Sequence, residues 1–328
     1  MTTILSGIQP SGTLHLGNYF GAIQQHIAMQ ERDADLFYFI ADYHALTTLR
    51  DAAALRDNVF DVAVSYLALG LDPEKVALFR QSDVPEVTEI AWLLATVTGM
   101  GLLERAHSYK DKVAQGIKPS IGLFTYPILM AADILAYDSD IVPVGKDQVQ
   151  HVEMTQDMAT HFNTAFKSEV FRRPEWEMAA TTSAQKVPGL DGQKMSKSYG
   201  NTIPIFLEGK PLKKLVNRIV TDSRPPEEAK NPDELFLFDL LALFLDASEL
   251  ADWKSQVAAG GEGAPGYGHL KARVREGVEE HFAAARLRRT ELIANPDYVE
   301  SVLAAGAEKA RLRARLVRDR ALKACGLR

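Results

Sequence analysis

The sequence predicts an α/β protein in which a doubly wound, mostly parallel, Rossmann-like sheet is followed by a helical domain. Apolar runs of strand length alternate with helical stretches through the first half of the chain, which is typical of right-handed crossovers between parallel strands. After about Lys186 the apolar spacing is helical to the end, and no run there is typical of a strand.

The first predicted strand covers residues 3–8, and the turn-forming segment QPSGTLHLG leads from it into a helix over 16–30. Further strands are expected at 36–41, 76–79 and 141–144, and further helices at about 52–69, 86–98 and 127–136. The expected domains are a sheet domain over 1–200, a helical domain over 201–295 and a C-terminal helix over 296–328 that packs back on the sheet domain.

Length and composition suit an intracellular protein of two domains. The chain has 328 residues, of which 46% are hydrophobic and 24% charged. Its start has no basic stretch followed by a long apolar one, and Asp133, Asp239 and Asp246 interrupt later apolar runs, so we expect neither export nor membrane insertion. The single cysteine, Cys325, excludes intrachain disulfides and Cys-based zinc clusters, and the histidines show no metal-ligand spacing. A cytoplasmic location is therefore expected.

The charge argues against a protein that coats DNA or RNA indiscriminately, because the net charge is −6 and the pI about 5.8. A nucleic-acid partner would meet local basic clusters late in the chain. These clusters are Lys271, Arg273 and Arg275; Arg286, Arg288 and Arg289; and Arg311, Arg313, Arg315, Arg318 and Arg320. Each cluster is equally well explained as the solvated face of an amphipathic helix.

Two motifs carry the chemistry. The first, GIQPSGTLHLGN at 7–18, opens a helix directly after the first strand and so presents free backbone N–H groups where nucleotide phosphates usually bind. Gly17 lets a ligand approach the backbone, and His15 and Asn18 can donate hydrogen bonds to it. Taken alone, a glycine turn with a capping serine is equally common without a ligand.

The second motif, KMSKS, lies at 194–198 in the polar segment between the predicted domains. Five specified residues match by chance in a chain of this length with a probability on the order of one in ten thousand. Lys194 and Lys197 offer point charges to a triphosphate. The competing interpretation is a lysine-rich and serine-rich surface loop.

The pair PSGTLHLGN and KMSKS resembles the two signatures of the class I aminoacyl-tRNA synthetases, and GIQPSG, HLGNY, TYPILMAADIL and VPVGKDQ resemble the bacterial tryptophan branch of that family. The resemblance implies activation of L-tryptophan by ATP with Mg²⁺ and transfer of tryptophan to tRNA(Trp). It also implies a homodimer in which residues 1–200 are catalytic and 201–295 read the anticodon. Asn18 stands where many class I enzymes carry a second histidine, but the tryptophan branch commonly has asparagine there.

A third segment places Tyr126, Met130 and Asp133 at i, i+4 and i+7, on one face of a helix that Pro127 starts or kinks. A flat aromatic ligand with one N–H donor would match two apolar groups and a carboxylate. An ordinary helix face, with an aspartate that caps or pairs, is the alternative. The resemblance favours the pocket, because it implies that Asp133 binds the indole nitrogen.

The resemblance also assigns the other site residues. The expected catalytic residues are His15, Lys112, Lys194 and Lys197. The expected ATP contacts are Gln9, Pro10, Ser11, Gly17, Asn18, Gly145, Lys146, Asp147, Val187, Lys194, Met195, Ser196, Lys197 and Ser198. The expected tryptophan contacts are Gln9, Tyr126, Met130, Asp133, Val142, Val144 and Gln148, with Leu5, Ile8 and His44. For the last three, a place in the core is an equal alternative. No residue is expected to bind a metal.

Three other functions are alternatives to this one. The tyrosine branch of the same family is disfavoured by HLGNY and MAADIL. The small nucleotidyltransferases share a histidine-bearing phosphate turn but lack this length and the helical tail. A non-catalytic tRNA-binding paralogue is disfavoured because His15, Lys194 and Lys197 are all present.

Overall fold

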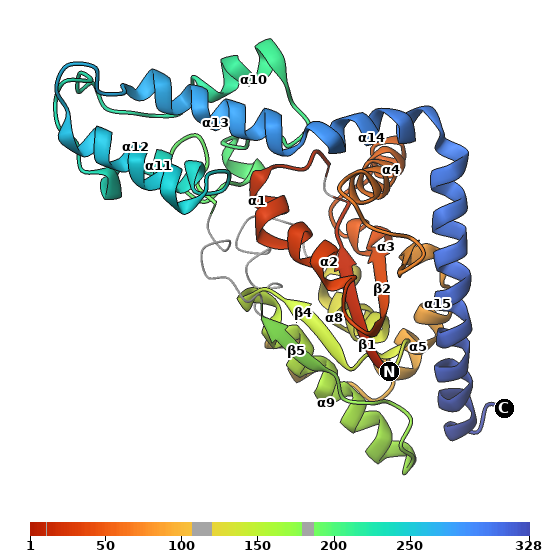
Figure 1. Ribbon diagram of the computed structural model, residues 1–328. Helices are drawn as coiled ribbons and strands as arrows, with labels where there is room; N and C mark the ends of the chain where they lie inside the picture. The colour runs from red at the N-terminus through yellow and green to blue at the C-terminus, as the bar shows by residue number, and fades with distance from the viewer. Residues whose placement is uncertain (11, 107–119, 179–186) are drawn as a thin grey trace.

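The computed structural model describes residues 1–328 except 11, 107–119 and 179–186. In this part of the chain a five-stranded sheet lies at the centre, in the order β3-β2-β1-β4-β5, and all its pairs are parallel (Figure 1). The strands are β1 Thr2–Ile8, β2 Ala34–Ile40, β3 Val76–Arg80, β4 Ile141–Val144 and β5 Glu175–Met178. The predicted doubly wound fold is confirmed.

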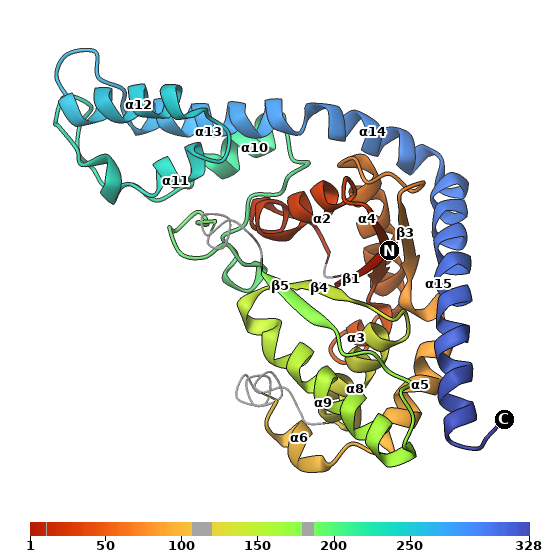
Figure 2. The same cartoon turned by 60° about the horizontal axis from the view of Figure 1, so that its bottom comes forward.

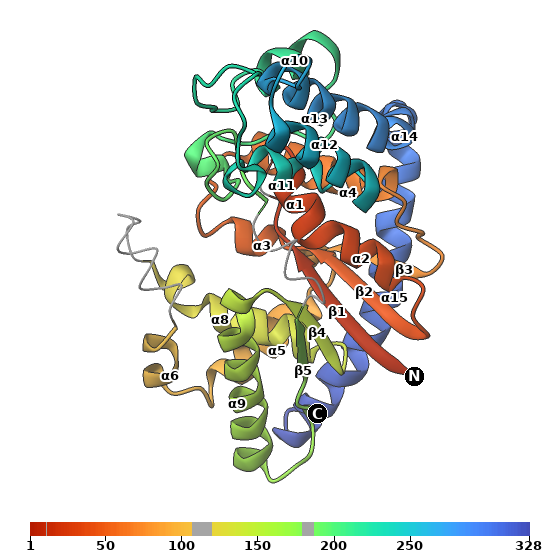
Figure 3. The ribbon, with the colours of Figure 1, turned by 60° about the vertical axis from the view of Figure 1, so that its left-hand side comes forward.

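Helices cover both faces of the sheet. Figure 3 shows α2 and α4 on one side of the strands and α5, α8 and α9 on the other. The helices of the first half are α1 Leu16–Asn18, α2 Gln24–Met29, α3 Asp42–Ala45, α4 Ala52–Ala68, α5 Glu86–Ala95, α6 Met100–Glu104, α8 Ile121–Leu135 and α9 Val149–Phe166. Shorter turns are the π-helical η1 Tyr19–Ile23 and the 3₁₀ segments η2 Gln81–Asp83 and η3 Lys146–Gln148.

Successive residues of a strand pack into two separate apolar cores, one on each face of the sheet. Ile4 of β1 joins the apolar cluster beneath α2 and α4, whereas Leu5 joins the cluster beneath α5, α8 and α9. Side chains alternate between the faces of a strand, so a sheet that is buried on both sides reads as a continuous apolar run. The strand order reverses between β1 and β4, and ligands of doubly wound sheets bind at the carboxyl ends on either side of such a reversal.

The second half of the described chain is helical. Its elements are η5 Lys197–Tyr199, α10 Gly209–Val216, η6 Pro232–Glu234, α11 Leu237–Leu241, α12 Ala247–Ala259, α13 Tyr267–His281, α14 Ala283–Ala294 and α15 Pro296–Ala324. Helix α15 runs back along the sheet and packs on β3 and α5 (Figure 2). A Cβ added at Gly306 would lie 2.1 Å from the carbonyl oxygen of Leu78, so glycine permits this close contact.

Three elements differ from the predictions. Strand β5 was not predicted, because it is an edge strand in which Glu175, Trp176 and Met178 are exposed and no apolar run forms. Helix α8 begins at Ile121 rather than near 127, because the hydroxyl of Ser120 caps it by accepting a hydrogen bond from the backbone N–H of Leu123 at 3.1 Å. The predicted helix over 16–30 contains the π-helical turn η1.

Within the described ranges, every helix is either too short or too polar to span a bilayer.

Candidate active site

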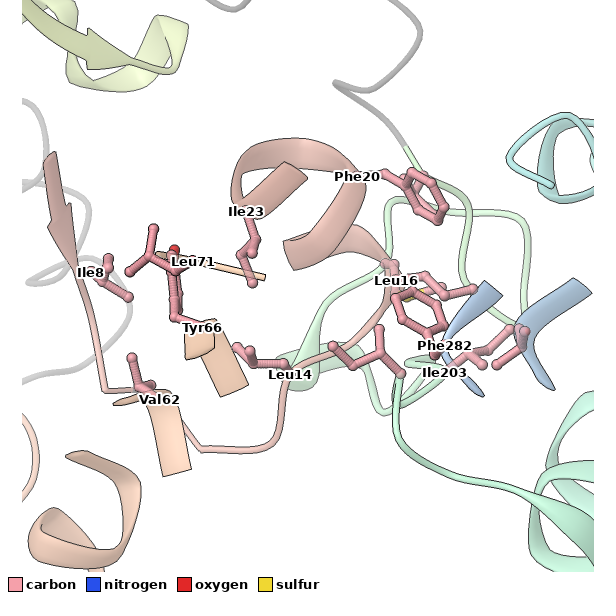
Figure 4. Close-up of a cluster of buried hydrophobic side chains, with 14 of the residues drawn as sticks. Ile8, Leu14, Leu16, Phe20, Ile23, Val62, Tyr66, Leu71, Ile203 and Phe282 are labelled. Atoms are coloured by element: carbon pink, nitrogen blue, oxygen red, sulfur yellow. The ribbon is translucent and has the colours of Figure 1, made fainter. Parts of the chain in front are cut away.

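The two sequence motifs meet in space at the carboxyl edge of β1. The backbone N–H of Leu16 donates to the carbonyl of Ile203 at 3.0 Å, and that of Ile205 donates to the carbonyl of Leu14 at 3.2 Å. The segment that follows the second motif therefore runs beside the first, and Leu14, Leu16 and Ile203 lie in one buried cluster (Figure 4). These hydrogen bonds hold the segment after the second motif beside the first motif.

Glycine and methionine bring the motifs into direct contact. A Cβ added at Gly17 would lie 3.1 Å from the ring of His15 and 3.3 Å from Cβ of Met195, which is tighter than most van der Waals contacts. Met195 is 4% exposed, so its side chain points inward while Lys194 and Lys197 on either side stay at the surface. Gly17 is thus the residue at which the first motif (7–18) and the second motif (194–198) are in contact. Below, these are called the phosphate turn and the lysine segment.

His15 is a neutral, buried side chain at the start of α1. It is 6% exposed, and its Nδ1 atom is buried and makes no hydrogen bond among the described residues. Burial, helped by the charge of Lys197, lowers the pKa of His15 to about 4. Because an unsatisfied buried polar atom is costly, this ring is well placed to gain a partner from a ligand. Asn18 is already engaged, since its Oδ1 accepts from the N–H of His15 at 3.2 Å.

Lys197 lies over the turn between β1 and α1. A Cβ added at Gly12, where φ is +82°, would lie 3.9 Å from its ammonium nitrogen. Partial desolvation lowers the pKa of Lys197, while the charge of Asp61 acts in the opposite direction. The ammonium group therefore lies beside the turn that leads into α1, and a cation at the start of a helix suits the binding of an anion.

Asp133 of α8 is the second chemical centre. It is 1% exposed, and its Oδ2 lies 2.8 Å from Nε2 of His44. The amide nitrogen of Gln81 donates to Oδ1 at 2.8 Å and to Oδ2 at 2.9 Å. Burial raises the pKa of Asp133, while its bonds to His44 and Gln81 oppose the shift. A carboxylate has about four acceptor positions, so it can accept one further N–H.

Aromatic and polar side chains surround this carboxylate. The hydroxyl of Tyr126 lies 2.6 Å from Nε2 of His151, and its ring meets that of His44 at a centroid distance of 6.2 Å and an angle of 79°. Met130 is partly buried one turn before Asp133 on α8. The structure thus brings His44 to the face that Tyr126, Met130 and Asp133 share. Gln81, at the end of β3, was missed because no local pattern links it to α8.

The other predicted residues are placed as follows. After β1, Gln9 is exposed and Pro10 is buried. After β4, Gly145 and Lys146 are exposed and Gln148 is partly buried. Val187, beneath the second motif, is 3% exposed. Leu5, Ile8 and Val142 are 1%, 8% and 5% exposed within the cores, and Val144 is partly buried. Ser196 is partly buried and Ser198 exposed. Ser11, Lys112 and the side chain of Asp147 lie outside what the structure describes.

Comparison with known families decides between the candidate classes. The family model described as "tRNA synthetases class I (W and Y)" matches residues 1–283. The chain belongs to the class I tRNA synthetases. In this synthetase the first motif follows the carboxyl end of β1, whereas Asp133 lies near the end of α8, the helix that precedes β4.

Relatives of this synthetase are similar over its whole length. The tryptophan–tRNA ligase of Rhodopirellula baltica is 55% identical over 99% of both chains, and that of Fusobacterium nucleatum is 53% identical over 95% of this chain and 94% of its own. A crystal structure of the Campylobacter jejuni tryptophanyl-tRNA synthetase complexed with ADP and tryptophan is 46% identical, with a TM-score of 0.93 over 99% of this chain and all of the other.

Proposed function

We propose that this synthetase is a tryptophan–tRNA ligase that joins L-tryptophan to AMP and then transfers it to the 2′-hydroxyl of the terminal adenosine of tRNA(Trp). The observation that carries the proposal is that Gly17 lies against the ring of His15 and against Met195, which brings the first motif and the KMSKS segment into contact. The full-length similarity to tryptophan–tRNA ligases supports the choice of amino acid. Charging of tRNA(Trp) with labelled tryptophan tests it, and charging of tRNA(Tyr) with tyrosine instead would contradict it.

In the first step the tryptophan carboxylate attacks the α-phosphorus of ATP, forming a P–O bond while the bond to the leaving pyrophosphate breaks. No protein nucleophile is needed, so the enzyme supplies alignment and charge stabilisation. The ammonium groups of Lys194 and Lys197 stabilise the charge that develops on pyrophosphate, and the neutral His15 holds the phosphates. Lys112 is assigned to the same task, and Gly145 to Asp147 to the ribose. Mg²⁺ would be held by the phosphates of the bound ATP and would supply further neutralisation of their charge beside Lys194 and Lys197.

The amino-acid site lies around Asp133. Its carboxylate accepts the indole N–H, while His44 and Gln81 hold it in place through the hydrogen bonds already described. Tyr126 and Met130 pack against the ring. Smaller amino acids lose these contacts and leave a buried acceptor unpaired, so this pocket discriminates without a separate editing site.

A basic hollow in the helical domain supports an anticodon-reading role. The hollow is about 340 Å³, lies between α10 and α13, and is lined by Lys213, Val216, Asn217, Gly268, Lys271, Ala272 and Arg275. Nε of Arg275 is buried and makes no hydrogen bond among the described residues, although it forms an ion pair with Glu279 at 3.7 Å. Burial lowers the pKa of Lys271. Three cations around small and apolar residues suit a base and its phosphate.

The RNA role has a direct test. Lys271→Gln and Arg275→Gln should weaken the binding of tRNA(Trp) and flatten its salt dependence, while ATP–pyrophosphate exchange stays unchanged. Binding that is unaffected by both substitutions would remove the hollow from the proposal. The exposed Lys309→Gln on α15 is the matched control.

An exposed apolar face supports a homodimer. Helix α8 packs against both α5 and α6. Each of these helices exposes a large apolar side chain: Trp92 of α5 at 71%, Met100 of α6 at 66% and Ile121 of α8 at 78%. Large exposed apolar side chains on neighbouring helices are typical of an interface between two copies. Sedimentation equilibrium should give a dimer at micromolar concentration and a shift toward monomer for Trp92→Glu; a monomeric wild-type protein would contradict the proposal. The proposed tRNA partner places the protein in the cytoplasm.

A further inference from the structure

Asn201 holds the backbone of the second motif from within the protein. It is 3% exposed, and its Oδ1 accepts a hydrogen bond from the N–H of Ser196 at 2.8 Å. Its Nδ2 donates to the carbonyl of Lys194 at 3.2 Å. The amide therefore binds the backbone on both sides of Met195, and the donor and acceptor partners fix which way the amide points.

A carboxylate and a glycine set the position of Asn201 in turn. Oδ1 of Asp191 accepts from Nδ2 of Asn201 at 2.7 Å and also from the N–H of Gln193 at 3.0 Å. A Cβ added at Gly189 would lie 2.3 Å from Nδ2 of Asn201, so the chain packs directly on the amide. Both amide hydrogens and the amide oxygen of Asn201 are thus used, in a buried site with no room to shift.

We propose that Asn201, oriented by Asp191, is a positioning residue that fixes Lys194 and Lys197 in register with the phosphate turn. The two hydrogen bonds from Asn201 to the backbone hold Met195 inward against Gly17. The side chains of Lys194 and Lys197 then point outward from the same backbone segment. Lysine side chains are long and flexible, so their reach to a developing charge depends on where the backbone starts. This inference rests on the proposed function of the lysines, and it adds that Asn201 acts through them without touching substrate.

The first test measures kcat and KM of ATP–pyrophosphate exchange together with the Kd of tryptophan. Asn201→Ala should lower kcat by about 10-fold or more, since displacing catalytic groups by about 1 Å costs up to about 10²-fold, and should leave the tryptophan Kd within about twofold. Asn201→Asp keeps the acceptor for Ser196 but places a second carboxylate beside Asp191, so kcat should also fall. Adding Asp191→Asn restores a donor–acceptor pair and should recover part of the activity.

Asn163 supplies the matched control. Its amide binds the backbone at Val170 and Phe171 with three hydrogen bonds of 2.8 to 3.0 Å, far along the chain from the motifs. Asn163→Ala should lower the thermal midpoint without changing kcat. If Asn201→Ala behaves in the same way, with a lower midpoint and an unchanged kcat, Asn201 is merely structural and the inference is overturned, although the proposed function stands.

A double-mutant cycle separates the inference from the proposed function. In the Lys194→Ala/Lys197→Ala background, Asn201→Ala should lower kcat by less than about twofold, because the groups that it positions are gone. A full loss in that background would show that Asn201 acts by another route and would overturn the inference. If the lysine substitutions themselves leave kcat unchanged, the proposed role of the motif fails, and the inference fails with it.

Discussion

Nε2 of His44 and Oδ2 of Asp133 lie 2.8 Å apart in a hydrogen bond that joins α3, the short helix after β2, to the last turn of α8. With Gln81, which donates from the end of β3, this bond holds a fully buried carboxylate in one orientation. A carboxylate held in this way discriminates among ligands by the direction in which its remaining acceptor position points.

Asp133→Ala should weaken tryptophan by roughly 1.5 to 3 kcal/mol, because it removes a charge-assisted hydrogen bond to the indole, and should hardly change ATP binding. The thermal midpoint should fall as well, since His44 and Gln81 lose their partner. Equilibrium dialysis for tryptophan and ATP checks the first two effects, and thermal unfolding checks the third.

A loss of stability alone would not show whether Asp133 binds the indole or is an ordinary buried aspartate. The ratio of kcat/KM for tryptophan to kcat/KM for a benzothiophene analogue distinguishes these two roles. This ratio should fall in Asp133→Ala, because the penalty for leaving the carboxylate unpaired disappears. Asp246→Ala, which removes a carboxylate that caps α12 by accepting from the N–H of Glu249 at 2.8 Å, should leave the ratio unchanged. An unchanged ratio in Asp133→Ala would refute Asp133 as the specificity residue.

Lys197→Ala should lower kcat of tryptophan activation by about 10²-fold to 10³-fold, or roughly 3 to 4 kcal/mol, because the ammonium acts mainly on charge that develops in the transition state. Tryptophan binding should hardly change. Single-turnover formation of the adenylate measures the effect. The exposed Lys210→Ala, on α10, should be neutral. A normal rate, or a loss confined to tryptophan affinity, would contradict the role assigned to Lys197.

His26 should make the protein less stable in acid. It is buried between Ser6 and Tyr66, with a ring nitrogen 3.0 Å from the hydroxyl of each, and burial lowers its pKa from 6.5 to about 4. The unfolded chain therefore binds a proton between pH 6.5 and 4 that the folded chain does not, so stability is full above 6.5 and falls as the pH drops toward 4. Below pH 4 the full shift in the pKa of His26 lowers the free energy of unfolding by about 3 kcal/mol.

Urea unfolding at pH 7.5 and pH 5 measures this effect. His26→Phe should reduce the loss of unfolding free energy between the two pH values, whereas His161→Gln, at an exposed position of α9, should not. His15, whose pKa is also about 4, contributes in the same direction and remains in both variants. Equal pH dependence in wild type and His26→Phe would show that His26 does not carry it.

Gly306→Ala should destabilise the protein, although alanine in a helix usually stabilises it by about 1 kcal/mol relative to glycine. The added Cβ would lie 2.1 Å from the carbonyl oxygen of Leu78, so α15 must move off β3 or strain the strand. The free energy of unfolding should fall by about 1 to 3 kcal/mol, as measured by chemical unfolding. Gly101→Ala, where nothing lies within 4 Å, should be neutral or slightly stabilising. A stabilised Gly306→Ala would refute the close packing.

The sequence predicted the elements whose signal is local. The apolar run at 141–144 matches β4, and the periodic stretch at 52–69 matches α4 to within one residue. The edge strand Glu175–Met178 has no such run, because only a buried strand must be apolar.

The site could be predicted only in part. His15 and Lys197 lie in motifs whose residue pattern is informative by itself. Gln81 and Asn201 act through hydrogen bonds to segments that are distant in sequence or in a turn, and a single amide leaves no periodic trace. Likewise, nothing in the order of residues showed that Asp133 would be bonded to His44, because their contact depends on the packing of α8 against the sheet.

The most direct test of the central claim is ATP–pyrophosphate exchange measured with each of the twenty amino acids in turn. The proposed function predicts rapid exchange with tryptophan and background exchange with the other nineteen, tyrosine included. Exchange that depends on tyrosine, or none with any amino acid while tRNA(Trp) still binds, would contradict it.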